Sequence, residues 1–343
     1  MMKTEKIEKI FHNATRSALI HEAVLFVENT TGDFSADFGY GGKDIDSPIM
    51  TASIGKMYTA TCILILQEQK KLSLKDPLEK YFEKPVLDGL HIYNGVDYAH
   101  KMTVGDILFH NSGLPDLFEE GGVKMEAITN DIFISFDEKL ARMKKLKPHF
   151  APGTHNKAYY SDFNFDLLGE IIEKTTGMPL DKVYQEFIFN PLGLTKTYLP
   201  ANENDFIPNI YFKKKSIHRP KAIVSFRAGG ACVSTARETM LLLKSFWNGS
   251  LFPKSILKEI AVYRKLQLAM SPLCYGGGYM QIPLGGLATL FMGKGELIGH
   301  SGSTACCAFY YPLHDLYIVC DFNQMADPAL PIKVAIKIAM EAK

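Results

Sequence analysis

The feature that most constrains the fold is the placement of strand-like segments at both ends of the chain, with helical segments between them. Residues 21–42, HEAVLFVENTTGDFSADFGYGG, contain two strand-like runs joined by a Thr-Gly-Asp turn, which predicts a β-hairpin. After about residue 272 the chain has four more short runs of this kind: YGGGYMQI, LATLFMG, ACCAFYYP and LYIVCDFN. A sheet that joins these segments must be built from both termini.

Helical patterns fill most of the remaining chain. They are predicted at the N-terminus, from about Ser53, through much of residues 72–219, from Thr235 with Glu238 at capping-box spacing, and in the tail PALPIKVAIKIAMEAK. A helix from about Phe163 to Thr176 ends at Gly177, with Pro179 beyond it. We therefore predict a discontinuous α/β domain, residues 1–71 and 220–343, with a helical domain, residues 72–219, inserted in it. The functional site is expected at their interface.

Composition excludes several classes of function. The formal net charge of the 343 residues is +1, and the longest basic run is Lys213–Lys215, so nucleic acid is a poor candidate partner. No segment has the roughly 18 to 20 apolar residues of a membrane span, and the N-terminus lacks a secretory signal, which predicts a cytoplasmic protein. The six cysteines have no CxxC spacing and the ten histidines form no HExxH cluster, so a metal site is not expected.

A candidate nucleophile lies in the stretch TASIGKMYTA, residues 51–60. Ser53 precedes Lys56 by three positions at the head of a predicted helix, so the two side chains share one helix face. A lysine amine in contact with a serine hydroxyl can activate it, and the N–H groups of a helix N-terminus suit a developing negative charge. The pattern alone is weak, because serine is also a common N-cap and Ser255 with Lys258 repeats the spacing.

Further motifs distinguish Ser53 from Ser255. In chain order they are SIGK at 53–56, MTVGDILFHNSGLP at 102–115, FAPGTHNKAYYSDFNFDLLGEIIEKTTG at 150–177, AGGACVSTARE at 228–238 and IGHSGSTACCAFYYP at 298–312. In this order they resemble the penicillin-binding-protein-like serine hydrolases, the family of class C β-lactamases, DD-peptidases and related esterases. The resemblance extends from about residue 23 to residue 322.

This resemblance implies a β-lactamase-like α/β (α+β) fold, in which helices flank an antiparallel sheet built from both termini. It implies that Ser53 is acylated with Lys56 as its partner, and that the Tyr160 phenol helps to move the proton. The triplet His300-Ser301-Gly302 would lie on a strand facing the nucleophile. The backbone N–H groups of Ser53 and Ser303 would form the oxyanion hole.

Two positions depart from the pattern of the family. Asp162 occupies a position that often holds asparagine, and an ionised carboxylate can only accept hydrogen bonds, although it could hold Lys56 as an ion pair. His300 replaces the lysine that supplies positive charge near a substrate carboxylate, and a histidine is charged only part of the time near neutral pH. An ionised Asp162 would bind a substrate amide less well. The loss of a permanent charge at His300 weakens the anchoring of an anionic β-lactam and favours uncharged ester or amide substrates.

Alternatives remain open at this point. Tyr159 is a second register for the tyrosine motif, and Ser161-Asp162 could instead align with the Ser-Asp-Asn motif of class A enzymes, although the third residue here is Phe163. The first hypothesis is a cofactor-free serine hydrolase for a small ester or amide, with a β-lactam or D-alanyl peptide second. The second hypothesis is a penicillin-binding or sensor-like module that acylates slowly or not at all. The oligomeric state is left undetermined.

Overall fold

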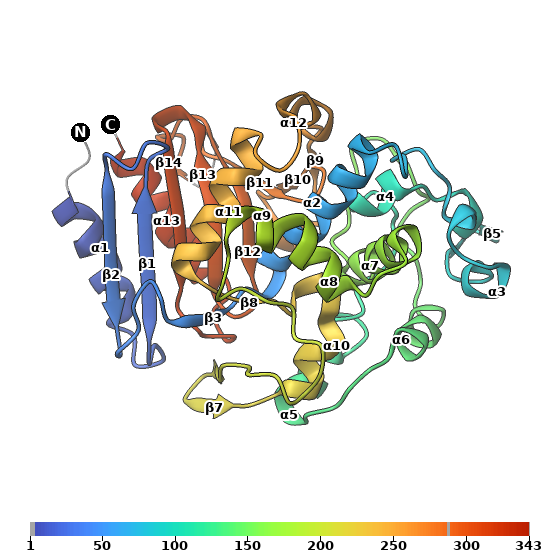
Figure 1. Cartoon of the computed structure of the whole chain (residues 1–343), viewed down its shortest axis with the longest axis horizontal. Helices are drawn as coiled ribbons and strands as arrows, with labels where there is room; N and C mark the ends of the chain where they lie inside the picture. Colours follow the sequence, from blue (N-terminus) through green and yellow to red (C-terminus); the bar gives the residue numbers. More distant parts are fainter. Residues whose placement is uncertain (1–3, 287–288, 343) are drawn as a thin grey trace.

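The computed structural model describes residues 4–286 and 289–342. Its centre is an eight-stranded antiparallel sheet in the order β2-β1-β14-β13-β12-β11-β10-β9 (Figure 1). The strands are β1 (Ala23–Glu28), β2 (Ser35–Tyr40), β9 (Arg264–Lys265), β10 (Cys274–Tyr275), β11 (Met280–Pro283), β12 (Glu296–Gly302), β13 (Cys306–Tyr311) and β14 (Leu316–Asp321). Because β1 pairs with β14, the sheet joins both ends of the chain, which confirms the predicted antiparallel α+β class.

Helices from both ends of the chain cover the sheet. They are α1 (Thr4–Thr15), α11 (Ala236–Asn248), α12 (Lys254–Ile260) and α13 (Leu330–Glu341). The α13 helix packs on β12, β13 and β14 and against α1, while α11 packs on β1, β13 and β14 (Figure 1). Every residue of β14 is buried as a result, and this explains the unbroken apolar run Leu316–Cys320 in its sequence.

The middle of the chain forms a second, mostly helical part beside the sheet (Figure 1). Its helices are α3 (Lys84–Leu87), α4 (Val104–Leu108), α5 (Val123–Thr129), α6 (Phe136–Met143), α7 (Asp162–Thr176), α8 (Leu180–Tyr184), α9 (Asn190–Leu192) and α10 (Pro220–Gly230). The remaining strands form three short pairs: β3 (Pro48–Met50) with β8 (Val233–Thr235), β4 (Ile92–Tyr93) with β5 (Val96–Asp97), and β6 (Ile210–Phe212) with β7 (Lys215–Ile217). The domain boundaries at residues 71 and 219 stay a prediction.

The helix that follows Ser53 lies between the two parts. This helix, α2 (Gly55–Glu68), contacts β12 of the sheet as well as α7 and α10. The α2 helix is buried nearly all round because it has neighbours in both parts. The predicted end of α7 at Gly177 is confirmed, since Gly177 adopts the left-handed conformation (φ +71°) typical of a helix C-terminus.

Two local predictions need correction. The run LATLFMG was expected to be strand-like, but residues 289–293 form turns, with Leu290 and Phe291 at positive φ; residues 287–288 lie outside the described residues. Thr235 does cap α11 by accepting a hydrogen bond from the Glu238 N–H. The Glu238 carboxylate does not return to complete a capping box.

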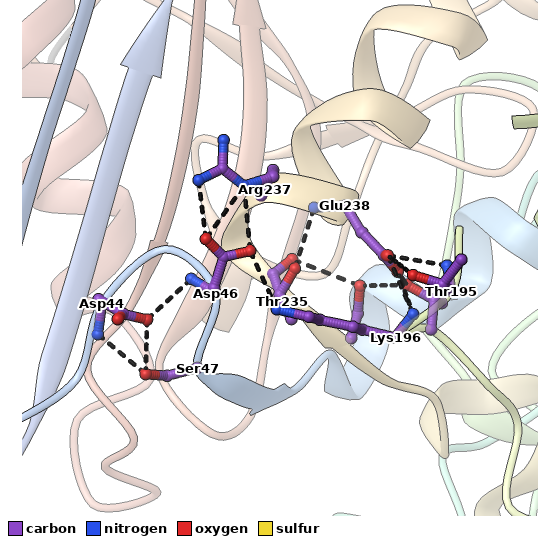
Figure 2. A network of polar contacts seen from close by, with 10 residues as sticks. Asp44, Asp46, Ser47, Thr195, Lys196, Thr235, Arg237 and Glu238 are labelled. Carbon is purple, nitrogen blue, oxygen red and sulfur yellow. Dashed lines mark hydrogen bonds and ion pairs between the residues drawn. The ribbon is translucent and has the colours of Figure 1, made fainter. Parts of the chain in front are cut away.

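Instead, Glu238 fixes a distant loop to the start of α11 (Figure 2). Its carboxylate accepts hydrogen bonds from the Thr195 N–H at 2.8 Å and from the Lys196 N–H at 2.9 Å. Next to it, Arg237 forms a paired contact with Asp46, which holds the segment leading into β3 (Figure 2). Since β3 leads directly to Ser53, this network supports the nucleophile turn from outside.

Candidate active site

Ser53 lies in a tight turn between a strand and a helix. The 3₁₀ turn Ala52–Ile54 follows β3 and continues into α2, and Ala52 has a left-handed backbone (φ +42°). The N-cap of α2 is Ile54, and no side chain caps either the turn or the helix. The Ser53 hydroxyl is therefore not used as a helix cap, and it accepts a hydrogen bond from Lys56 instead.

Lys56 is the centre of the polar contacts at the site. Its side chain is completely buried, and its Nζ lies 3.1 Å from the Ser53 Oγ. The same Nζ lies 2.7 Å from the carbonyl oxygen of Gly229 and 2.6 Å from the Asp162 Oδ1. The first turn of α2, the end of α10 and the start of α7 thus meet at one ammonium group.

Two glycines allow the backbone to approach the nucleophile turn closely. A Cβ added at Gly302, the last residue of β12, would lie 2.7 Å from the Ala52 Cβ and 2.9 Å from the Thr51 carbonyl oxygen. A Cβ added at Gly230 would lie 2.7 Å from the Ala52 carbonyl group and 3.2 Å from the Ser53 nitrogen. These distances are too short for any larger residue, so both glycines are required for the packing around Ser53.

Tyr160 lies directly above Lys56, in the segment that precedes α7. The Lys56 Nζ is 5.1 Å from the centre of the Tyr160 ring, which is within the range of a cation–π contact. The Tyr160 hydroxyl is buried without a hydrogen bond of ordinary geometry among the described residues. Burial and then the Asp162 charge raise the pKa of the phenol well above its usual value, while the Ser53 side chain opposes that rise. Tyr160 is therefore a neutral phenol in the free protein.

The loop containing HNSGLPD, residues 110–116, holds the tyrosine segment in place. The His110 Nδ1 accepts hydrogen bonds from the Ser161 N–H at 3.2 Å and from the Asn164 side chain at 2.9 Å. The Asp116 carboxylate accepts a hydrogen bond from the Asp162 N–H at 3.0 Å. Burial and then the Asp162 charge raise the pKa of Asp116 to about 8, so a largely protonated acid lies behind the Lys56–Asp162 pair at neutral pH.

His300 is buried on β12 and both its ring nitrogens have partners. The Nδ1 lies 2.7 Å from the Ser301 carbonyl oxygen, which can only accept, so Nδ1 carries the proton. The Nε2 therefore accepts a hydrogen bond from the Tyr275 hydroxyl, at 3.2 Å. Burial and then the Lys56 charge lower the pKa of His300 to about 3. The histidine is neutral at physiological pH, and this corrects the expectation that it is partly charged there.

A cavity opens beside Ser53. Ser53, Asp162 and Ser303 line it together, and so do the backbone atoms of Gly229 and Gly230. The rest of its lining is largely apolar and includes Met50, Phe118, Ile210, Ile223, Phe226 and Met325. Three charged side chains also line it: Lys139 and Asp166, which pair at 2.6 Å, and Arg219, which donates hydrogen bonds to the carbonyl oxygens of Ala127 and Ile128. Among the described residues, His300 and Ser301 are not part of this lining, and the Ser301 hydroxyl contacts the Met280 Sδ at 3.6 Å. The predicted roles of His300, Ser301 and Gly302 in binding substrate stay predictions.

The alternatives considered in the sequence lie elsewhere. The Tyr159 ring stacks on His149, with ring centres 3.6 Å apart, whereas Tyr160 stacks over Lys56. Ser255 and Lys258 are both exposed on α12. The geometry therefore favours Ser53 over Ser255 and Tyr160 over Tyr159 as members of the site.

Sequence reasoning missed two members of the site. Gly229, whose carbonyl oxygen accepts a hydrogen bond from Lys56, belongs to the motif AGGACVSTARE, to which no role was assigned. Asp116 follows directly after the SGLP motif, and its burial gave no signal in the sequence. The Gly-Gly pair was the one available signal, because glycines at a motif often mark a close backbone approach.

Comparisons with known proteins agree with this fold. The Beta-lactamase family profile matches residues 35–340, and the chain belongs to this family. It is 29% identical over 158 residues to the D-alanyl-D-alanine-carboxypeptidase/endopeptidase AmpH of Escherichia coli K12, which covers 46% of this chain and 38% of AmpH. It is 28% identical over 210 residues to Protein flp of Staphylococcus aureus N315, which covers 58% of this chain and 39% of flp. The matches thus span less than half of the length of these two relatives.

Solved structures with the same fold cover the chain almost completely. The D-stereospecific amidohydrolase from Streptomyces sp. superposes with a TM-score of 0.78 at 24% identity, covering 96% of this chain and 98% of that one. The D-amino acid amidase from Ochrobactrum anthropi SV3 superposes with a TM-score of 0.78 at 20% identity, and the match covers 97% of this chain and 98% of that one. At these identities the superpositions establish the fold alone. Among the described residues, no helix is both long and apolar enough to cross a membrane.

Proposed function

We propose that this chain is a serine hydrolase that forms an acyl-enzyme at Ser53. The observation that supports this most strongly is the 3.1 Å contact between the Lys56 Nζ and the Ser53 Oγ, in a turn that lines a cavity. A serine hydroxyl needs a neighbouring base to become a nucleophile, and Lys56 is the group in contact with it. Because Lys56 is buried in contact with Ser53, it can act as this base, whereas a solvated surface lysine could not.

The remaining roles follow from position. Ser53 attacks a carbonyl carbon, and the oxyanion is stabilised by the backbone N–H groups of Ser53 and Ser303, two residues that line the same cavity. The Lys56 amine accepts the Ser53 proton in its neutral form. Tyr160, a neutral phenol over Lys56, donates a proton to the leaving group and recovers it in deacylation. Water then releases the acid.

The cavity supports a small ester or amide with an apolar group as the substrate class. Its lining is mostly apolar next to Ser53, and apolar lining favours an uncharged substrate group. His300, at the position of the family's cationic residue, is neutral and has no free ring nitrogen. A β-lactam or D-alanyl peptide, whose carboxylate needs a cation, is therefore the second candidate.

A slow-acylating, sensor-like protein is the alternative function, and one observation favours it. Asp162 holds Lys56 in an ion pair at 2.6 Å, and a protonated Lys56 is not a base. Such a protein would be labelled at Ser53 but would release the acyl group slowly. Steady-state turnover separates this alternative from the hydrolase.

The experiment measures steady-state hydrolysis of short p-nitrophenyl esters, amino acid amides and nitrocefin by the wild type, Ser53→Ala and Ser255→Ala. Ser255 is a matched control because it has the same SxxK spacing on an exposed helix. The proposal expects ester or amide turnover that is lost in Ser53→Ala and kept in Ser255→Ala. Turnover that survives in Ser53→Ala would overturn it. A single stoichiometric burst on Ser53 without turnover would support the sensor-like alternative.

A further inference from the structure

The helix α10 borders the cavity beside Ser53 from one end of the helix to the other. Its lining residues recur at helical spacing and so share one face, and together with the N-cap residue they are Arg219, Ala222, Ile223, Phe226, Gly229 and Gly230. Gly230 lies against the turn that carries Ser53, whereas Arg219 lies at the opposite end of the helix. The cavity therefore extends from Ser53 towards the start of α10.

The position of Tyr160 indicates which part of a substrate enters this cavity. Tyr160 is the proposed proton donor to the leaving group, and within the described residues it does not line the cavity. The leaving group then lies on the side of Tyr160, and the acyl group lies in the cavity. The rings of Phe118 and Phe226 are in edge contact there, with their centres 5.7 Å apart, and provide the apolar surface that an alkyl or aryl acyl group needs.

Another wall of the cavity is the short helix α5 together with the loop before it. Ala127 of α5 and Phe118 of the loop both line the cavity. The Lys124 N–H donates a hydrogen bond to the Phe118 carbonyl oxygen at 3.0 Å, which joins the loop to the helix. With seven residues α5 is too short to be stable by itself, so tertiary contacts decide where this wall lies.

Arg219 fastens the end of α5 to the start of α10, and Figure 1 shows the two helices side by side there. Its Nε donates a hydrogen bond to the Ala127 carbonyl oxygen at 2.9 Å, and its Nη2 donates one to the Ile128 carbonyl oxygen at 2.8 Å. Carbonyl groups in the last turn of a helix have no partner within that helix, and here one guanidinium supplies two donors. Arg219 thus joins the two helices that border the cavity.

We propose that the cavity along α10 is the acyl-group pocket of the hydrolase, and that Arg219 is a positioning residue that limits the length of the acyl group by holding α5 against α10. This inference rests on the proposed function and names the part of the substrate that the enzyme selects. Without the two hydrogen bonds from Arg219, α5 and Phe118 can move away from α10, and the pocket admits a longer chain. The substrate class is an ester or amide with an apolar acyl group of restricted length.

The test measures kcat/KM for p-nitrophenyl butanoate and octanoate in the wild type, Arg219→Met and Arg219→Ala. One methylene group in an apolar pocket changes kcat/KM by about tenfold or more, so the ratio of octanoate to butanoate should rise at least about tenfold in both variants. Methionine keeps much of the bulk of arginine but has no donor, so it separates the hydrogen bonds from the size of the side chain. A ratio that rises in Arg219→Ala alone, or in neither variant, would overturn the inference.

Hydrogen exchange measures the fastening of α5 without turnover. The peptide that contains Val123–Thr129 should exchange about tenfold faster in Arg219→Met, because two charge-assisted hydrogen bonds are lost, while α13 keeps its rate. Arg16→Met is the matched control: Arg16 is exposed beyond the end of α1, so its loss should change neither the ester ratio nor the exchange of α5. Unchanged exchange of α5 in Arg219→Met would overturn the role of Arg219. Absence of Ser53-dependent turnover in the wild type would instead overturn the proposed function.

Discussion

The Tyr275 hydroxyl lies 3.2 Å from the His300 Nε2 and donates a hydrogen bond to it. Together with the contact between Nδ1 and the Ser301 carbonyl, it fixes the tautomer of the ring. In the family motif this position often holds a charged lysine. Here it holds His300, which is neutral and completely buried, and both of its ring nitrogens have hydrogen-bond partners. The cation that contacts Ser53 is Lys56, and it is paired with Asp162.

His300 should make the protein sensitive to acid. Its pKa of about 3 in the folded protein is below its unfolded value of about 6.5, so the unfolded chain binds an extra proton between these pH values. The unfolding free energy should fall as the pH decreases from 6.5 towards 4, by up to about 1.4 kcal/mol per pH unit. His300→Gln should have a shallower slope in urea titrations at pH 4, 5 and 7. Equal slopes in both proteins would contradict the buried neutral histidine.

Asp116 should have the opposite effect on the pH dependence of the unfolding free energy. Its pKa of about 8 in the folded protein exceeds its unfolded value of about 3.9, so its contribution is present at acid pH and is lost as the pH rises through 8. Asp116→Asn should keep more of its unfolding free energy between pH 5 and pH 8.5 than the wild type does. Urea titrations across this range measure the difference. Equal losses in Asp116→Asn and the wild type would show that the carboxyl is ionised in the folded protein across this range.

Gly302→Ala should displace the nucleophile turn. The added methyl group would lie 2.7 Å from the Ala52 Cβ, so either β12 or the turn must move. Displacement of about 1 Å at a catalytic group costs roughly 100-fold in rate. We expect kcat/KM to fall by about that factor and the melting temperature to decrease. Gly286→Ala is the control, because an added Cβ there has no atom within 4 Å among the described residues.

Glu238 should contribute more stability than its neighbour Arg237, although both belong to the network in Figure 2. Glu238 is buried and accepts hydrogen bonds from two backbone N–H groups, and such charge-assisted bonds contribute about 1.5 to 3 kcal/mol. Glu238→Gln should lower the unfolding free energy by about that amount. Arg237→Ala should have a much smaller effect that disappears at high salt, because its pair with Asp46 is solvent-exposed. Equal losses would show that the outer pair also holds the loop.

Much of the fold could be predicted from the sequence because its elements have strong local signals. The hairpin of residues 21–42, the end of α7 at Gly177 and the final helix depend on turn residues and periodicity, which are local properties. The strand prediction for the run LATLFMG was wrong because apolar residues in a short segment do not distinguish a strand from an exposed turn. In the structure Leu290 and Phe291 are 73% and 70% exposed. The burial of α2 on all sides depends on tertiary neighbours that periodicity does not report.

The residues of the candidate site also divide into those that local sequence patterns predict and those that depend on tertiary contacts. Ser53, Lys56 and Tyr160 could be identified from motif order, since each is part of a short pattern. The state of His300 could not be predicted, because it depends on burial and on Tyr275, which lies on β10, two strands away from β12 in the sheet. The contacts of Lys56 with Gly229 and of Asp162 with Asp116 likewise join segments far apart in the chain. Protonation at this site is a property of those tertiary contacts.

Covalent labelling of Ser53 tests the central claim most directly. The wild type and Ser53→Ala would be incubated with a fluorophosphonate probe, quenched in acid, and analysed by intact mass and peptide mapping. The account predicts one adduct per chain, on the peptide that contains Ser53, and none in Ser53→Ala. An adduct on a different residue, or ester turnover in a wild type that is not labelled at Ser53, would contradict it.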